Sequence, residues 1–183
     1  MKKTKEKVNA AIVIIGNEIL SGRTQDVNVV AISLWLNELG VKLEEVRVIP
    51  DIGTSIINTI NEVRKKFNYV FTTGGIGPTH DDITSQSVAK AFNIKYGYHK
   101  KAYTILKKYY GQAKFTLGRK KMAKMPIKAS LILNPSSGAP GFCIDNVYCL
   151  PGVPSILKSM LGGLKGKIKG GKKILIIFLL LVV

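Results

Sequence analysis

The sequence TTGGIGPTHDD, residues 72–82, decides how the surrounding chain is organised. It follows the apolar run YVF and precedes ITSQSVAKAF, which has the pattern of a helix. Glycines adopt backbone conformations that other residues avoid, and Gly74, Gly75 and Gly77 would let N–H groups approach an anion closely. We therefore expect a strand, a glycine-rich loop and a helix, in which the loop either turns the chain or holds an anion.

Strand and helix patterns alternate upstream of this loop. VNAAIVII, residues 8–15, is rich in β-branched residues, as are strands buried on both faces. Residues 28–39 space their apolar side chains as a helix does, and Gly40 follows where a terminating glycine belongs. A second strand over residues 41–49 precedes a helix capped by Thr54 or Ser55. This order predicts an α/β domain with a mostly parallel sheet.

Acidic side chains follow the ends of the predicted strands. Asp51 follows the second strand, while Glu18 and Asp26 flank the loop after the first. Asp81 and Asp82 follow the third strand, in a chain with only 11 acidic residues. Because ligands collect at the carboxyl ends of parallel strands, we expect these carboxylates to share one edge. Their concentration favours a metal–phosphate site over a set of unrelated turn residues.

The paired aspartates have two interpretations. One of them could cap the helix that follows. Both together, beside a glycine cradle, would repel a bound phosphate unless a cation lay between them. Mg²⁺ held by one or two carboxylates and by substrate phosphates is the usual solution. We therefore predict Mg²⁺ as cofactor, Asp81 and Asp82 as its ligands, and Asp82, Asp51 and Asp81 as the catalytic residues; His80 receives a minor role.

The downstream half contains a basic segment and a second candidate anion site. Residues 95–126 are rich in lysine and tyrosine, with a predicted helix over residues 102–110 that breaks at Gly111. LPGVPS, residues 150–155, ends a strand and begins a helix, so Gly152, Pro154 and Ser155 are candidate phosphate contacts.

Composition limits the classes of function. The 183 residues fit one domain, which we place at residues 1–163, and carry a net charge of +17. The lysines are spread along the chain without a repeated basic–aromatic pattern, which disfavours a nucleic-acid partner and leaves steering of an anionic small molecule open. Two cysteines without metal-ligand spacing are typical of a reducing cytoplasm.

Residues 164–183 read as a Gly/Lys linker followed by ten apolar residues, 174–183. A bilayer-spanning helix needs roughly twenty apolar residues, so we expect no transmembrane span. A buried strand and a membrane-surface anchor are alternatives, but the pattern favours a truncated chain or a displaced reading frame.

Four motifs together resemble a known family. IGNEILSGRTQDVN, TTGGIGPTHDDIT, NPSSGAPGF and LPGVPS occur in the order and spacing of the molybdopterin-binding domain family of the MoaB/Mog type. Within it the chain is most similar to the N-terminal domain of competence/damage-inducible protein A (CinA) and to the related domain of FAD synthases. The resemblance spans residues 8–161 and implies a three-layer α/β/α domain that forms homo-oligomers.

The resemblance also implies an activity and a set of site residues. Family members bind molybdopterin or adenylylate it with Mg²⁺ and ATP, whereas CinA-like members are associated with hydrolysis of a nucleotide pyrophosphate such as ADP-ribose. The family aspartates fall on Asp82 and Asp51, the first-loop acid on Glu18, and Asp81 is the extra carboxylate of the CinA branch. The expected ligand contacts are Gly16, Glu18, Gly74, Gly75, Gly77, Pro78, Thr79, Gly152, Pro154 and Ser155.

Three functions are therefore expected of the chain. The first is Mg²⁺-dependent attack on a phosphoanhydride, by water in a pyrophosphatase or by a pterin phosphate in an adenylyltransferase. The second is a binding module that holds a pterin or a nucleotide without turnover. The third, nucleic-acid binding, rests on the net charge alone and ranks last.

Overall fold

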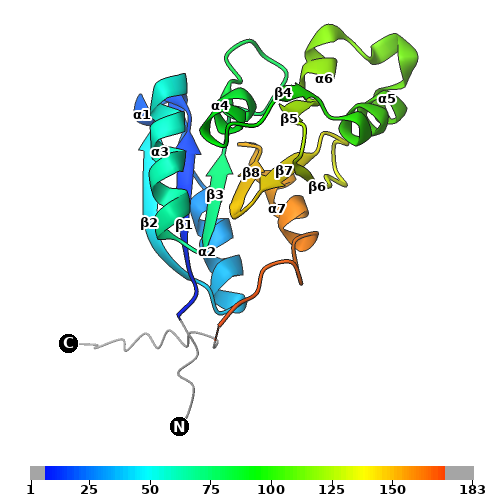
Figure 1. The fold of residues 1–183 in the computed structure, drawn as a ribbon. Helices are drawn as coiled ribbons and strands as arrows, with labels where there is room; N and C mark the ends of the chain where they lie inside the picture. The colour runs from blue at the N-terminus through cyan, green and yellow to red at the C-terminus, as the bar shows by residue number, and fades with distance from the viewer. Residues whose placement is uncertain (1–6, 172–183) are drawn as a thin grey trace, which may run out of the picture.

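The computed structural model describes residues 7–171 as one α/β domain (Figure 1). Its elements follow the predicted alternation in the first half, and the strands of the second half are shorter. In chain order they are β1 Asn9–Ile15, α1 Asn17–Leu20, α2 Asn28–Glu38, β2 Lys42–Ile49, α3 Gly53–Lys66, β3 Tyr69–Thr73, α4 Thr84–Ala91, β4 Tyr96–Tyr98, α5 Lys100–Lys114, α6 Leu117–Lys121, β5 Lys124–Pro126, β6 Ser130–Ile132, β7 Gly141–Ile144, β8 Val147–Leu150 and α7 Pro154–Gly162.

The main sheet has six strands in the order β2-β1-β3-β8-β7-β6. Strands β2, β1, β3 and β8 are parallel neighbours, and β7 runs antiparallel to both β8 and β6. The predicted mostly parallel sheet is confirmed. As a result, the loops after β1, β2, β3 and β8 all begin at the same edge of the sheet.

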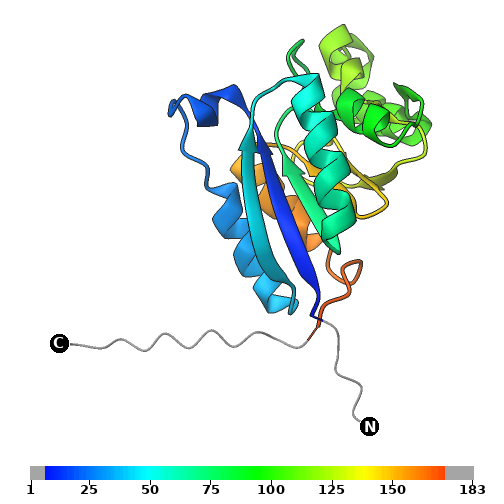
Figure 2. The same ribbon diagram turned by 60° about the vertical axis from the view of Figure 1, so that its left-hand side comes forward.

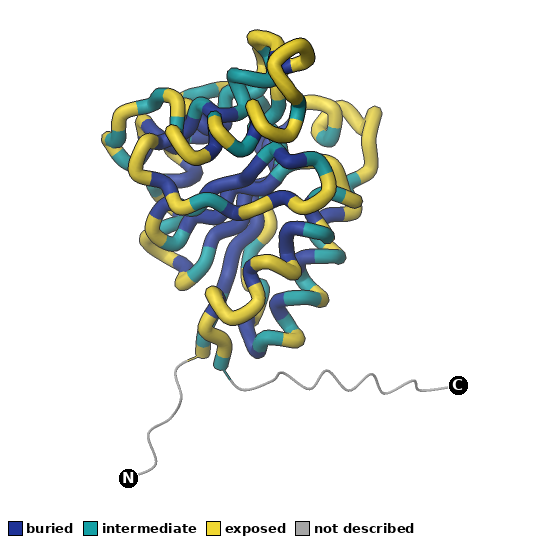
Figure 3. The backbone as a smooth tube through the Cα atoms, turned by 90° about the vertical axis from the view of Figure 1, so that its right-hand side faces the viewer, coloured by how far each residue is buried: buried dark blue, intermediate teal, exposed yellow. Residues whose placement is uncertain are grey.

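Helices cover both faces of this sheet, as alternate residues of β1 show. Ala11, Val13 and Ile15 pack in one core cluster with side chains of α3 and α4. Ala10, Ile12 and Ile14 pack in the other, with side chains of α2 and α7. Figures 1 and 2 show the helices on the two faces. In Figure 3 the central strands form the buried interior. The expected three-layer α/β/α arrangement is therefore present.

The start of α3 differs from the prediction. Neither Thr54 nor Ser55 caps the helix, because the helix begins at Gly53 and Ile52 occupies the N-cap position without a side-chain hydrogen bond. The N–H of Ile56 already donates to the carbonyl of Ile52 at 3.0 Å. The two hydroxyl residues therefore lie inside the first turn.

Residues 95–128 form a smaller lobe beside the main sheet (Figure 1). Strands β4 and β5 pair antiparallel in a sheet of their own, and α5 and α6 lie between them in the chain. The predicted break at Gly111 is confirmed, since this residue has φ +71° and interrupts the helical geometry of α5. We call residues 95–128 the basic lobe.

The expected linker packs on the domain in its described part. Leu164 and Ile168 are buried in the core cluster on the α2–α7 face, and the N–H of Gly171 donates to the carbonyl of Gly40. The predicted apolar tail, residues 174–183, lies outside the described residues. Between residues 7 and 171, no helix combines the length and the apolar character needed to cross a bilayer.

Candidate functional site at the carboxyl edge of the sheet

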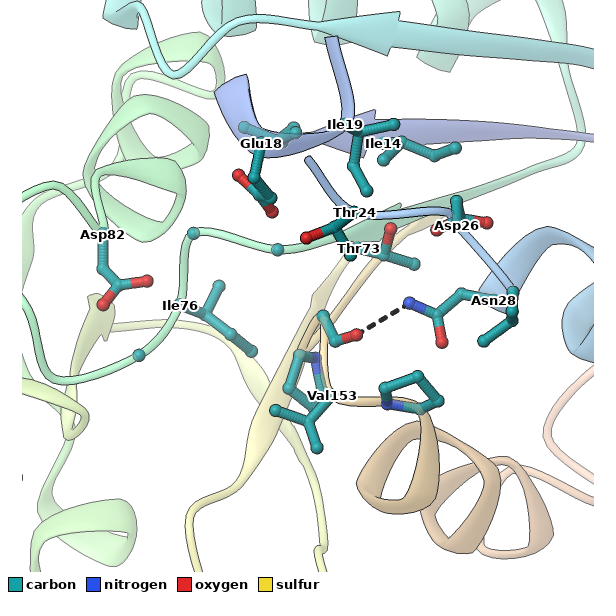
Figure 4. Close-up of a pocket in the computed structure, with 18 of the residues that line it drawn as sticks. Ile14, Glu18, Ile19, Thr24, Asp26, Asn28, Thr73, Ile76, Asp82 and Val153 are labelled. Atoms are coloured by element: carbon teal, nitrogen blue, oxygen red, sulfur yellow. Dashed lines mark hydrogen bonds between the residues drawn. The ribbon is translucent and has the colours of Figure 1, made fainter. Parts of the chain in front are cut away.

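Loops from three of the parallel strands surround one hollow of about 390 Å³, which we call the edge pocket. It is lined by the loop after β1, by the glycine-rich loop after β3 and by the turn between β8 and α7. Figure 4 shows Glu18 and Asp82 at one end and Asp26 and Asn28 at the other. Of the three loops predicted to converge here, those after β1 and β3 line the pocket, whereas the loop after β2 does not.

The glycine-rich loop has a structural role in addition to any role in ligand binding. Gly74 has φ +95°, and a Cβ built there would lie 2.2 Å from the carbonyl oxygen of Ile15. Its N–H already donates to the carbonyl of Leu150, so it is not available to an anion. The N–H groups of Gly75, Ile76 and Gly77 donate no hydrogen bond within residues 7–171. The part of the loop that can bind an anion is thus residues 75–77.

Asp82 lines the edge pocket and holds the loop in shape. Its Oδ2 accepts the N–H of Thr79 at 2.8 Å and the hydroxyl of Thr79 at 2.5 Å. Because α4 begins after Ile83 and has no side-chain cap, Asp82 is not its N-cap. The carboxylate also lies close to Gly77, where a Cβ would meet Oδ2 at 2.7 Å. Asp82 therefore closes the loop and presents its charge to the pocket.

The carboxylate of Asp51 lies behind the pocket rather than in its lining. Its Oδ2 accepts the N–H of Asn17 at 2.8 Å, which anchors the segment that carries Glu18. Burial raises the pKa of Asp51, and the nearby charges of Glu18, Asp81 and Asp82 raise it further, whereas the Asn17 N–H lowers it. Asp51 thus lies close enough to the other three carboxylates for their charges to act on it, as expected for a shared edge.

Asp81 and His80 are exposed and lie outside the pocket lining. The nearby hydroxyl of Thr79 and the charges of His80 and Lys121 lower the pKa of Asp81. Lys121 of α6 also donates to the carbonyl of Thr79. The structure therefore brings Asp82 and Glu18 to the pocket and leaves Asp81 and Thr79 on its outer side, whereas Pro78 remains in the lining.

The turn after β8 closes the opposite wall. Gly152, Val153 and Pro154 line the pocket, whereas Ser155 is exposed and lies outside it. Of the two helices expected to point at a ligand, α7 begins at the pocket, while the first residue of α4, Thr84, is buried away from it.

Asn28, the first residue of α2, is a pocket residue that the sequence analysis did not single out. It is 4% exposed, and its Nδ2 donates to the carbonyl of Gly152 at 2.8 Å (Figure 4). Its Oδ1 is buried and has no hydrogen-bond partner. Buried polar atoms are nearly always paired, so this oxygen marks a place where a ligand can donate. In the sequence, Asn28 resembles an ordinary residue at a helix start.

The donor set suits Mg²⁺ only in company with a substrate. Within residues 7–171, no group of three or more His, Cys, Asp or Glu side chains is arranged as a metal cage. Mg²⁺ commonly uses one or two carboxylates and completes its shell with water and substrate phosphates. Asp82 and Glu18, both in the pocket lining, fit that mode.

A mostly parallel sheet covered on both faces, with glycine-rich loops and carboxylates at its carboxyl edge, defines an α/β domain that binds small molecules at a strand edge. Comparison with known families is consistent with this class. Residues 11–168 match the family model described as "Probable molybdopterin binding domain". The chain belongs to this family, and the resemblance drawn from its motifs is confirmed.

Relatives from other organisms share most of this chain. A CinA-like protein of Sulfurihydrogenibium sp. is 36% identical over 161 residues, which cover 84% of this chain and 40% of the relative. A protein of Archaeoglobus fulgidus is 33% identical over 148 residues, which cover 81% of this chain and 63% of the relative. The chain thus spans less than two thirds of the length of these relatives.

Solved structures repeat the fold. The protein CinA from Thermoplasma acidophilum, described as of unknown function, superimposes with a TM-score of 0.81 at 33% identity; the match covers 88% of this chain and 98% of that one. The tungsten cofactor synthesizing protein MoaB from Pyrococcus furiosus gives a TM-score of 0.57 at 20% identity, covering 88% and 92%. The second likeness shows the fold alone, and the first places the chain beside the CinA type.

Proposed function

We propose that this chain is a CinA-like domain that hydrolyses the phosphoanhydride of a nucleotide pyrophosphate of the ADP-ribose type, with Mg²⁺. The observation that carries the proposal is the edge pocket itself. Residues 75–77, whose N–H groups donate no hydrogen bond within residues 7–171, line the same hollow as Glu18 and Asp82. N–H groups bind phosphate oxygens, and carboxylates beside a phosphate require a cation.

A second hollow beside the edge pocket favours a ligand with two ends. It also measures about 390 Å³ and shares with the edge pocket Ile76, Gly77, Pro78, Pro151 and Val153. Arg119, whose guanidinium lies 4.2 Å from the ring centre of Tyr110, and Asn134 line it on the far side. A dinucleotide has a pyrophosphate between two sugar-bearing ends, so it could place the pyrophosphate at Gly77 and Pro78 and one end in each hollow.

In the proposed hydrolysis, the residues in and behind the edge pocket have different roles. The N–H groups of residues 75–77 hold the phosphate oxygens, and Asn28 accepts a hydrogen bond from a hydroxyl or amine of the ligand. Asp51 holds the segment that presents Glu18. Mg²⁺, bound at Asp82 and Glu18 and by the substrate, would supply positive charge to the phosphate oxygens. Water adds to one phosphorus, the P–O–P bond breaks, and two phosphate monoesters leave with release of protons.

Hydrolysis of ADP-ribose to AMP and ribose 5-phosphate, followed by ³¹P NMR with and without Mg²⁺, tests the proposal. Asp82→Asn keeps an oxygen for Thr79 but loses the charge, so we expect its kcat to fall at least about 100-fold. Asp81→Asn, outside the pocket, serves as the matched control and should fall less than about tenfold. Tight binding of ADP-ribose by the wild type without hydrolysis would remove the catalytic claim and leave a binding module.

Molybdopterin adenylylation is the second candidate, and the family membership favours it. It requires ATP and a pterin phosphate as nucleophile in place of water. Incubation with ATP, Mg²⁺ and molybdopterin distinguishes the two activities, because only the transferase forms an adenylylated pterin and pyrophosphate.

A further inference from the structure

The basic lobe carries a large share of the positive charge of the chain. Between Lys95 and Lys128 there are 11 lysine and arginine residues and no aspartate or glutamate. The ion pairs found among residues 7–171 lie on β2 and α3, and none includes a residue of the lobe. These cations therefore give the lobe a concentrated charge that no ion pair within residues 7–171 neutralises. The lobe lies beside the main sheet (Figure 1).

Aromatic rings lie among these cations. Tyr98 is 47% exposed, and its ring meets that of Tyr103 edge to face at 5.5 Å. The ammonium of Lys124 lies 5.0 Å from the ring centre of Tyr98. Tyr109, on the exposed side of α5, is 53% exposed. Exposed tyrosines beside lysines offer ring faces and charges to the same ligand.

One hollow in the lobe brings both features together. It measures about 630 Å³ and does not share a residue with the edge pocket. We call it the tyrosine hollow; its lining is Tyr98, Lys100, Tyr103, Thr104, Leu117 and Lys120. Proteins that bind single strands combine aromatic rings, on which bases stack, with a positive groove that follows the phosphates.

We propose that the basic lobe binds single-stranded nucleic acid, with a base stacked in the tyrosine hollow and phosphates on Lys100, Lys120 and the exposed lysines of α5. A small anionic substrate would need only the charges beside the edge pocket. Lys107, Lys108 and Lys114 line neither the edge pocket nor the second hollow, so the charge extends well beyond the needs of such a substrate.

An anionic membrane surface is the main competitor, because Leu117 is 82% exposed. A membrane-binding helix presents an apolar face beside its lysines. Along α5, however, Ala102 and Leu106 are buried, while Lys101, Lys107 and Lys108 are exposed. The apolar face of α5 is thus used by the core, and the face left to solvent is cationic. This arrangement favours a charged polymer over a lipid surface.

Fluorescence anisotropy with a labelled 20-nucleotide oligo(dT) and an oligo(A) RNA tests the proposal over a range of NaCl concentrations. Lys100→Gln combined with Lys120→Gln removes two charges from the tyrosine hollow. Lys65→Gln combined with Lys158→Gln removes the same charge from exposed positions on α3 and α7 and is the matched control. Tyr98→Leu removes the ring and keeps an apolar side chain, and circular dichroism verifies its folding.

We expect binding at 50 mM NaCl that weakens steeply with salt. The lobe pair should reduce the slope of log K against log[salt] by about 1.4, since each single-strand phosphate contact contributes about 0.7; the control pair should leave it unchanged. Loss of one stacked base should weaken binding by roughly 5- to 150-fold in Tyr98→Leu. The proposal fails if neither oligonucleotide binds at 20 mM NaCl, if the two lysine pairs act alike, or if Tyr98→Leu binds as the wild type does. Binding to phosphatidylglycerol vesicles but not to the oligonucleotides would assign the lobe to membranes and overturn it.

Discussion

The unpaired oxygen of Asn28 provides a sharp test of the edge pocket. Asn28→Ala removes one hydrogen bond, from Nδ2 to the carbonyl of Gly152, and the buried Oδ1 that has no partner. The lost hydrogen bond costs about 1 kcal/mol, which for a domain of this size lowers Tm by roughly 2–4 °C. The stability of the free protein should therefore change little.

Ligand binding should change far more than stability. A buried acceptor left unpaired costs about 1–3 kcal/mol, and a ligand that donates to Oδ1 recovers this cost on binding. Asn28→Ala should therefore weaken the binding of ADP-ribose and Mg²⁺ by about 5- to 150-fold. Isothermal titration calorimetry measures this change directly, and a thermal melt of the free protein measures the change in Tm.

Asn146 provides a matched control. Its Nδ2 donates to the carbonyls of Arg64 and Phe67, its Oδ1 is also buried and unpaired, and it lies in the turn before β8, at the opposite edge of the sheet. Asn146→Ala loses two hydrogen bonds, so it should destabilise the fold by about 2 kcal/mol and leave binding unchanged. Equal affinities of the wild type and Asn28→Ala would refute a ligand contact at Oδ1.

Three further outcomes follow from the described contacts. Gly74→Ala should cost more than about 2 kcal/mol in chemical denaturation, because it strains a positive φ and its Cβ meets the carbonyl of Ile15. An unchanged midpoint would contradict the close approach of Gly74 to Ile15. Burial raises the pKa of Asp51, so the folded state holds its proton to higher pH than the unfolded chain and stability falls as pH rises through that window. Asp51→Asn should accordingly gain stability relative to the wild type as pH rises from below the ordinary pKa of aspartate towards neutrality in urea titrations, and a constant difference would refute this. Burial raises the pKa of the buried Cys149 to about 12, and partial burial raises that of Cys143 to about 11. Neither thiol should therefore react quickly with iodoacetamide at pH 8 in the native protein, as peptide mass spectrometry would show, and rapid labelling would contradict the raised pKa values.

The first half of the fold could be predicted because its signals are local. β1 is a β-branched run buried on both faces, and the glycine after α2 does adopt a positive φ, +73° at Gly40. The cap of α3 could not be predicted from preference alone. Thr54 and Ser55 are favourable N-cap residues. The first turn, however, closes on the carbonyl of Ile52, so both residues lie inside the helix and cannot cap it.

Some residues of the candidate site could likewise be predicted from the sequence, and others could not. Glu18 and Asp82 could be placed at the pocket because strand ends determine where loops emerge. The role of Asp51 as an anchor for Asn17, and the exposure of Ser155, depend on side-chain direction, which residue type does not determine. Asn28 needed the structure most of all, because its partner, Gly152, lies 124 residues further along the chain.

The basic segment over residues 95–126 was visible in the sequence, but its folding into one lobe was not. Lysines occur in every part of the chain, and only the pairing of β4 with β5 gathers residues 95–128 into one body. The acidic residues, in contrast, lie on other parts of the chain, where some of them pair with Lys42, Arg47 and Lys66. The lobe is basic because it holds 11 of the 28 lysines and arginines of the chain and no aspartate or glutamate.

The place of β8 in the middle of the sheet has a consequence for folding. Val70 of β3 pairs with Val147, and β3 has β1 on its other side. During synthesis β3 therefore remains an unpaired edge until residue 150 has left the ribosome, and closing so long a loop slows the step. Gly74 receives its partner, the carbonyl of Leu150, in that same step. The binding edge is thus one of the last parts of the domain to form, and a nascent chain shorter than this is both incompetent for ligand and exposed to aggregation along β3.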